Sequence, residues 1–166
     1  MDQKLTPHIS YLLYRHDCVI VPGFGGFVAN YQAARIHPTQ HTFSPPCKNI
    51  AFNRSLQNND GLLANRIAEA ENISYPEANQ AIAREIENWN STLETTKKLT
   101  IDRVGLLSFD VEQNLRFEPE TKVNYLLDAF GLMEVQSPPV KREGAIDKLI
   151  AEAPTKKNPT KKAKVR

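Results

Sequence analysis

The feature that most constrains the fold of this chain is an internal repeat. Residues 18–27 (CVIVPGFGGF) and residues 99–109 (LTIDRVGLLSF) each lead from a β-branched, apolar segment through a glycine-containing turn to a phenylalanine. Each copy is followed later by a short apolar segment that ends in phenylalanine and a polar residue, at residues 50–53 and 115–118. Aligning the two segments pairs Gly23 with Gly105, Val19 with Ile101 and Phe27 with Phe109. A repeated unit of strand, turn and strand indicates a duplicated small domain.

The length of 166 residues fits two such domains. Domains of about 70 residues are only marginally stable alone, so two packed copies would stabilise one another. We predict a first domain over residues 1–58, a second over residues 59–132, and a disordered tail rich in proline and lysine over residues 133–166.

The net charge of +2 is distributed unevenly along the sequence. Residues 154–166 carry +6, which leaves −4 on residues 1–153. Within these, residues 1–58 carry +3 and residues 60–131 carry −6. The first copy is therefore better suited than the second to contact a polyanion.

Capping signals predict two short helices, one before the first strand and one before the longest helix. Thr6, followed by proline, is typical of an N-cap and predicts a helix over residues 7–15. Asp60 can cap a second helix, which would complete a helical layer shared by both copies over residues 56–70. The apolar face of this helix would contain Leu63, Ile67 and Ala70.

The clearest helix begins at Ser74, which has Glu77 at the spacing of a capping box. An apolar stripe of about four turns follows, made of Ala78, Ile82, Ile86, Trp89 and Leu93. A short last helix is predicted over residues 123–130, with Gly131 as its left-handed C-cap.

Strands are predicted between these helices, at residues 19–21, 27–31, 48–53, 99–103, 107–112 and 115–117. Gln113 and Asn114 separate the last two strands and have the length of a tight hairpin turn. In the first copy, residues 32–46 form a longer polar excursion at the corresponding place.

This order of elements resembles the HU and integration host factor class of bacterial DNA-bending proteins. Residues 60–131 resemble an HU protomer over their full length, and residues 18–53 resemble its β-half. The supporting motifs are Ile73-Ser74, Val104-Gly105, Phe109 and Phe117-Glu118-Pro119 in the second copy, and residues 23–27 and Ala33-Ala34-Arg35 in the first.

The sequence is more closely similar to the tandem HU-like domains of Bacteroidetes proteins, a family related to a eukaryotic coiled-coil-domain-containing protein. The shared motifs are Val21-Pro22-Gly23, Pro45-Pro46, Phe52-Asn53 and Asn59-Asp60-Gly61. The resemblance implies an α+β fold in which each copy packs helices on a three-stranded antiparallel β-meander. It also implies that the copies pair within one chain as an intramolecular pseudo-dimer. In longer relatives a transmembrane helix and a SPOR domain often follow, and neither is recognised in this sequence.

HU-class proteins bend DNA with β-arms that enter the minor groove and insert an apolar wedge, usually a proline. In the first copy, residues 32–46 could form such an arm with Pro38 as the wedge. The alternative is a polar surface loop that its prolines merely restrict. The second copy is not expected to bend DNA, because a two-residue turn replaces its arm and Leu107 aligns with a hairpin glycine.

The candidate nucleic-acid-binding residues of the first copy are Arg35, His37, Pro38, His41, Lys48 and Arg54. Those of the tail are Lys156, Lys157, Lys161 and Lys162. The tail could also act as a solubilising end or as a juxtamembrane basic segment that approaches a membrane surface.

No enzyme signature is present, and we expect no cofactor, metal or small-molecule substrate. The glycine-rich turn at residues 23–27 has no helix behind it to hold a phosphate, and the four histidines are scattered. Cys18 and Cys47 show no metal-ligand spacing, and no export signal precedes them, which favours a reduced cytoplasmic setting.

Two non-enzymatic functions remain. One is a sequence-tolerant, nucleoid-associated DNA-binding module. The other is a protein-interaction adaptor that links a cytoplasmic or DNA-bound partner to the cell envelope. A basic stripe joining Arg35, Lys48 and Arg54 would favour DNA, whereas an exposed apolar patch would favour a protein partner.

Overall fold

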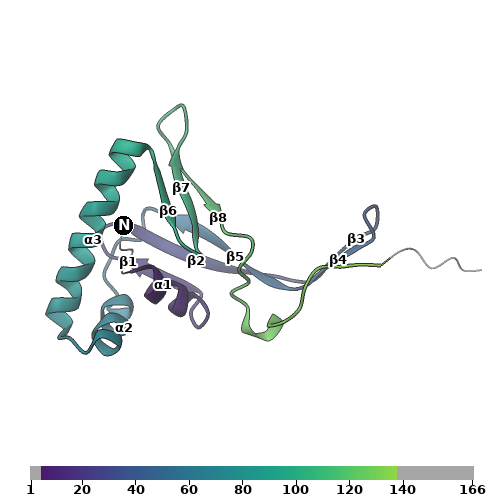
Figure 1. Ribbon diagram of the computed structural model, residues 1–166, viewed down its shortest axis with the longest axis horizontal. Coiled ribbons are helices and arrows are strands. Elements are labelled where there is room, and N and C mark those ends of the chain that lie inside the picture. The colour runs from purple at the N-terminus through teal and green to yellow at the C-terminus, as the bar shows by residue number, and fades with distance from the viewer. Residues whose placement is uncertain (1–4, 138–166) are drawn as a thin grey trace, which may run out of the picture. The chain divides into compact units, whose positions relative to one another are not determined.

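The computed structural model describes residues 5–137 (Figure 1). The helices are α1 (Thr6–Leu13), α2 (Leu62–Glu71) and α3 (Tyr75–Thr96), with a 3-10 turn η1 (Leu127–Ala129). The strands of the first copy are β1 (Cys18–Val21), β2 (Gly25–Gln32), β3 (Arg35–His37), β4 (Thr42–Ser44) and β5 (Cys47–Asn53). Those that follow are β6 (Lys98–Ile101), β7 (Gly105–Phe109), β8 (Leu115–Pro119) and β9 (Val135–Gln136).

The strands form three antiparallel sheets with three strands each. Their orders are β1-β2-β5, β6-β7-β8 and β3-β4-β9. The first two are the β-meanders expected of the two copies, and the architecture is the α+β fold that the sequence resemblance implies. The third sheet is built from the excursion of the first copy and from a strand near the end of the described chain.

The repeat is real, but the alignment of its glycines is wrong by two residues. Val21 pairs with Gly25 in the first meander, and Ile101 pairs with Gly105 in the second. Gly25 is therefore the counterpart of Gly105, and a Cβ atom on either would meet the ring of the phenylalanine beside it, Phe52 or Phe117.

This register also changes the interpretation of Gly23 and Leu107. The place of Gly23 (φ +77°) is taken in the second copy by Arg103 (φ +63°), so both turns need a left-handed residue there but only one uses glycine. Leu107 opposes Phe117 as Phe27 opposes Phe52. Leu107 is thus a core residue and not a substitute for a hairpin glycine.

The capping box of α3 is confirmed, and the caps of the other helices differ from expectation. Ser74 accepts a hydrogen bond from the Glu77 backbone, and Glu77 accepts one from the Ser74 backbone. Helix α1 starts one residue earlier than predicted, with Leu5 at its N-cap and Thr6 inside the helix. Gly61 occupies the N-cap of α2, although Asp60 still accepts a hydrogen bond from the Leu62 amide at 3.0 Å.

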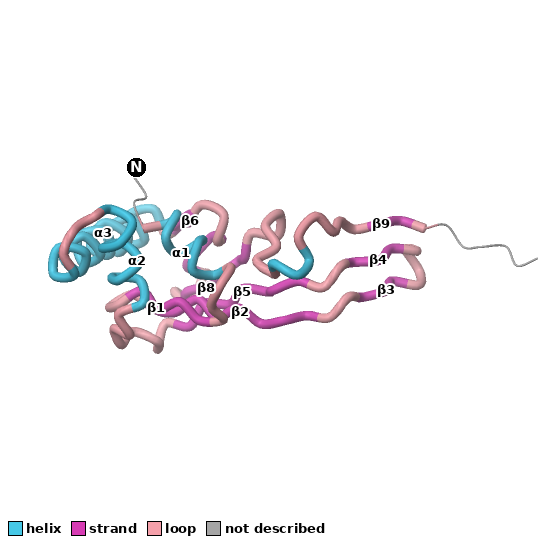
Figure 2. The backbone as a smooth tube through the Cα atoms, turned by 90° about the horizontal axis from the view of Figure 1, so that it is seen from below, coloured by secondary structure: helices cyan, strands magenta, loops and turns pink. Residues whose placement is uncertain are grey.

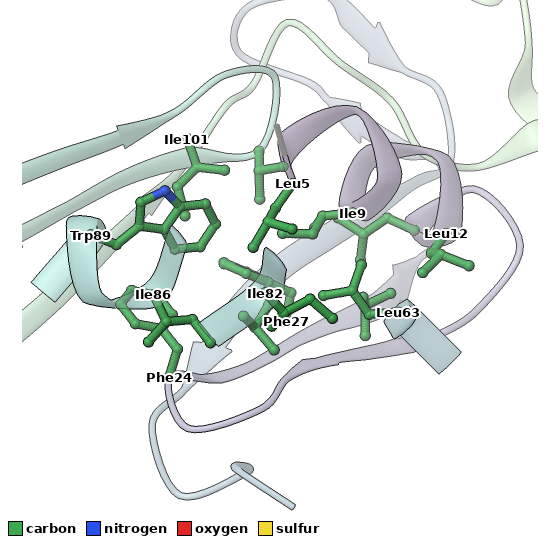
Figure 3. Close-up of a cluster of buried hydrophobic side chains, with 14 of the residues drawn as sticks. Leu5, Ile9, Leu12, Phe24, Phe27, Leu63, Ile82, Ile86, Trp89 and Ile101 are labelled. Atoms are coloured by element: carbon green, nitrogen blue, oxygen red, sulfur yellow. The ribbon is translucent and has the colours of Figure 1, made fainter. Parts of the chain in front are cut away.

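One hydrophobic core contains residues from both copies (Figure 3). The predicted stripe of α3 is buried throughout, whereas α2 buries Leu63, Ala64 and Ile67 and leaves Ala70 exposed. Phe27 contacts both Phe52 of its own meander and Phe117 of the other, with ring centroids 5.2 and 5.7 Å apart. Helix α2 packs on α1 and β1. The second copy therefore supplies a helix to the layer that covers the first sheet.

Two predicted elements near the end of the second copy differ from expectation. The last paired residues of β7 and β8 are Phe109 and Leu115, so the connection spans residues 110–114 and is not a two-residue turn. The predicted last helix is only the short turn η1, although Gly131 does adopt a left-handed conformation (φ +79°). Strand β9 was not anticipated from the sequence.

Candidate nucleic-acid interface

The excursion of the first copy is a β-hairpin and not a polar loop. Gln32 pairs with Cys47, and three residues further on Arg35 pairs with Ser44, so β3 and β4 continue the register of β2 and β5. The interruption lies where Pro45 and Pro46 stand, because proline has no N–H group to donate to the ladder. We call residues 33–46 the arm. Figure 2 shows that it extends β2 and β5 away from the helices.

Four of the predicted contact residues lie on the arm. Arg35 and His37 are exposed residues of β3, and Pro38 opens the turn that joins β3 to β4. His41 closes this turn in a left-handed conformation (φ +52°). The structure thus brings Arg35, His37, Pro38 and His41 to the outer part of one hairpin.

The arm also carries an apolar row that the sequence analysis did not identify. Ile36 pairs with Phe43, and Phe43 pairs with Val135 of β9. Directly opposed residues of antiparallel strands point to the same face of a sheet. Ile36, Phe43 and Val135 therefore share one face, where they are 65%, 44% and 56% exposed.

The second copy forms hydrogen bonds with the root of the arm, at Pro46 and Lys48. The Asn124 side chain donates to the carbonyl oxygen of Pro46 at 3.0 Å and accepts weakly from the Lys48 amide at 3.4 Å. Next to it, the buried Tyr125 hydroxyl donates to the Arg103 carbonyl oxygen at 2.8 Å, and burial raises the pKa of this hydroxyl. Nothing in the local sequence pattern pointed to Asn124, because its partners lie almost half the chain away.

Lys48 and Arg54 do not join the arm residues in a basic stripe. The Lys48 ammonium forms an ion pair with Asp17 at 2.9 Å, and its side chain is only 13% exposed. Arg54 follows the end of β5 that is remote from the arm, where it lines a pocket of about 290 Å³ together with Glu94. The predicted continuous stripe is therefore absent from the described residues.

A different group of bases lies close to the arm root. Arg15, Arg103 and Lys122 line one pocket of about 450 Å³, which also contains Asn124 and the exposed Phe130. Sequence inspection missed this group because each base has an acidic residue within two positions, which hides it from a search for charge runs. The arrangement could hold phosphate groups beside an apolar surface.

In the second copy the place of the arm is closed by a compact loop. The Asp110 carboxylate accepts hydrogen bonds from the amides of Glu112 and Asn114, both at 2.9 Å, and from the Arg116 side chain at 3.0 Å. The Asn114 amide is the main cause that lowers the pKa of this carboxyl group, and Arg116 adds to the effect. The loop therefore uses this carboxylate to hold its own backbone, where the first copy has its arm.

The part of the chain that the structure describes contains no cluster of metal-ligating side chains. Within residues 5–137 there is no group of three or more histidine, cysteine, aspartate or glutamate side chains that could hold a metal ion. Across the same range, no helix has the length and apolarity to cross a bilayer. The tail candidates Lys156, Lys157, Lys161 and Lys162 lie outside the described residues.

Comparisons with known proteins agree with this architecture. The family model for the CCDC81-like prokaryotic HU domain 1 matches residues 2–60, and the model for domain 2 matches residues 61–130. Comparison with curated proteins and with solved structures gives no match. The two matched ranges correspond to the two β-meanders and their helices. The chain therefore belongs to the CCDC81-like prokaryotic HU domains and carries domains 1 and 2 of that family in tandem.

Proposed function

We propose that this chain is a non-enzymatic, sequence-tolerant DNA-binding module of the nucleoid that contacts duplex DNA through the arm of its first domain. The observation that carries the proposal is the arm itself, a hairpin that extends the first meander and has Pro38 in its turn. Minor-groove binding by β-arms with an apolar wedge is an established mode of DNA recognition. In this proposal the two domains comprise residues 1–58 and 59–132, pair as a pseudo-dimer and act in the cytoplasm.

Each part of the proposed interface has a separate role. Arg35 supplies the permanent charge of the arm, and His37 and His41 add ring nitrogens that can form hydrogen bonds. Arg15, Arg103 and Lys122 supply phosphate contacts beside the arm root. The lysines of the tail would add contacts that follow the backbone without reading sequence.

The charge distribution implies weak binding with few phosphate contacts. Residues 1–153 carry −4, and Lys48 is already paired with Asp17. Because each neutralised phosphate adds about 0.9 to the slope of log affinity against log salt, we expect a shallow slope. A protein with a continuous basic cradle would show a steep one.

The test is a titration of the full chain with a short fluorescent duplex at about 50 and about 200 mM salt. The double variant Arg35→Ala with Pro38→Ala should bind at least about tenfold more weakly, or about 1.4 kcal/mol. Arg84→Ala is the matched control, since it removes one exposed positive charge from α3. Equal losses in the two variants would assign binding to net charge and not to the arm.

A protein-interaction adaptor is the second candidate, and the exposed apolar row of Ile36, Phe43 and Val135 favours it. Exposed apolar patches commonly mark contacts with other proteins. Such an adaptor would link a cytoplasmic or DNA-bound partner to the cell envelope. A full chain that fails to bind duplex DNA even at about 50 mM salt would support this candidate over the first.

A further inference from the structure

We propose that β9 is a removable third strand that closes the arm, and that the arm engages DNA only after β9 has left β4. This inference rests on the proposed function, because it concerns the regulation of the same site. Strand β9 pairs with β4 through two residue pairs, Val135 with Phe43 and Gln136 with Thr42.

The width of the arm is the first argument. Neighbouring strands lie about 4.8 Å apart, so a two-stranded arm spans about 5 Å between strand axes and a three-stranded arm spans about 10 Å. The minor groove of B-form DNA is only about 6 Å wide. Pairing with β9 therefore about doubles the axis-to-axis width of the arm, which makes the three-stranded form less suited to a narrow groove than the hairpin of β3 and β4 alone.

The weak attachment of β9 is the second argument. Only two residue pairs join it to β4, with one further hydrogen bond from the Ser44 hydroxyl to the Glu134 carboxylate at 3.2 Å. The chain that leads to β9 is also poorly buried, since Phe130 is 91% and Met133 80% exposed. Release of this segment therefore exposes little further apolar surface of its own side chains.

The position of Glu134 gives a reason for release. Its carboxylate lies on the arm beside Ser44, whose strand partner is Arg35. A phosphate backbone that approaches Arg35 repels this carboxylate, so DNA and the closed arm disfavour one another. DNA that binds only the open arm shifts the population toward it by mass action.

A reversible disulfide tests the proposal in the full chain. Phe43→Cys with Val135→Cys is introduced after Cys18→Ser and Cys47→Ser have removed the free cysteines. Opposed Cβ atoms in antiparallel strands are about 4.5–5.5 Å apart, close to the distance that a disulfide needs. The oxidised and reduced forms have the same composition and charge, so each is the control for the other.

An opened arm provides the opposite test. Val135→Pro with Gln136→Pro removes both N–H groups of β9, so the pairing with β4 is lost whichever of them is bonded. Val135→Ala with Gln136→Ala is the matched control, because it shortens the same side chains and keeps both N–H groups.

We expect the oxidised form to bind duplex DNA about tenfold more weakly than the reduced form, or about 1.4 kcal/mol. The proline variant should bind more tightly than its alanine control. Equal, measurable binding by the oxidised and reduced forms would overturn the role of β9 and leave the DNA-binding proposal intact. Failure of the disulfide to form would overturn the placement of β9 on β4. Absence of binding by every form, the proline variant included, would overturn both proposals.

Discussion

The two domains contain meanders of the same topology, and these meanders differ mainly at one connection. Between its second and third strands the first domain inserts the arm, whereas the second closes the same connection with the Asp110 loop at residues 110–114. The second domain in turn holds the arm, through Asn124 at its root and β9 along β4. The first domain therefore carries the arm and the second supports it, and the proposed function assigns DNA contact to the first domain.

The net charges of the two domains also differ. Residues 1–58 carry +3 and residues 60–131 carry −6, although the folds are alike. Three bases near the arm root are exceptions that come from both domains, namely Arg15, Arg103 and Lys122. A phosphate backbone is therefore expected to meet the molecule at the arm and its root, and not across both sheets.

The largest expected effect tests whether the two domains form one cooperative unit. Phe27 is fully buried and contacts the rings of Phe52 and Phe117 in different domains, so Phe27→Ala should cost about 3–5 kcal/mol of unfolding free energy. For the unchanged chain and for Phe27→Ala alike, urea unfolding should show a single transition that coincides when followed by Trp89 fluorescence and by circular dichroism. Separate transitions would mean that the domains unfold independently. Phe130→Ala is the control, since that ring is 91% exposed.

A smaller effect tests the equivalence of the two meanders. Gly25→Ala and Gly105→Ala should each cost about 1–3 kcal/mol, because the new methyl group meets the ring of Phe52 at Gly25 and, at Gly105, the Glu118 carbonyl oxygen and the ring of Phe117. Gly23→Asn should change stability by less than about 0.5 kcal/mol, since its site is open and asparagine tolerates a left-handed backbone. Thermal unfolding of the three variants measures their losses of stability and so ranks them. A costlier change at Gly23 than at Gly25 would contradict the corrected alignment.

Replacing the arm of the first domain with the short loop of the second tests whether the arm is needed for DNA binding. Replacing residues 33–46 with the sequence of residues 110–114 should leave the core intact and weaken duplex binding at least about tenfold, or about 1.4 kcal/mol. Fluorescence anisotropy measures the affinity, and circular dichroism checks the fold. Exchanging residues 110–114 for a glycine-serine loop of equal length is the control and should leave binding unchanged. Full binding by the grafted chain would remove the arm from the proposed interface.

The smallest effect concerns the helix that both domains share. Ser74→Ala should cost about 1 kcal/mol through the loss of its N-cap bond. Hydrogen bonds from Ser74 lower the pKa of the Glu77 carboxyl group below its usual value of 4.5. Its stabilising contribution is therefore complete above that pH and is lost as the pH falls through the lowered pKa. The stability difference between the natural chain and Glu77→Gln should shrink on acidification, and a constant difference in thermal scans would contradict this role.

Sequence inspection predicted the elements whose signals are local. The capping box at Ser74 and the stripe from Ala78 to Leu93 depend on residues three or four positions apart, and both are confirmed. The paired phenylalanines of the two meanders, Phe52 and Phe117, were also identified correctly. The glycine alignment failed because a single sequence does not show which turn residue needs a left-handed backbone, and Arg103 fills such a place without being glycine.

The candidate site was predicted only in part for the same reason. The arm residues were found because they are consecutive in the chain, whereas Lys48 and Arg54 were included by charge alone. Whether a lysine is free to meet a phosphate depends on its neighbours in space. For Lys48 that neighbour is Asp17, which lies on another segment.

By itself, the sequence determined that this protein contains two HU-like meanders, a long capped helix and one copy with room for an arm. Only the tertiary structure decided that the excursion folds as that arm, that Asn124 holds its root, and that β9 covers its edge. The physical reason is the range of the interactions. Periodicity and caps arise between neighbours along the chain, while edge pairing, ion pairs and shared cores depend on where distant segments meet.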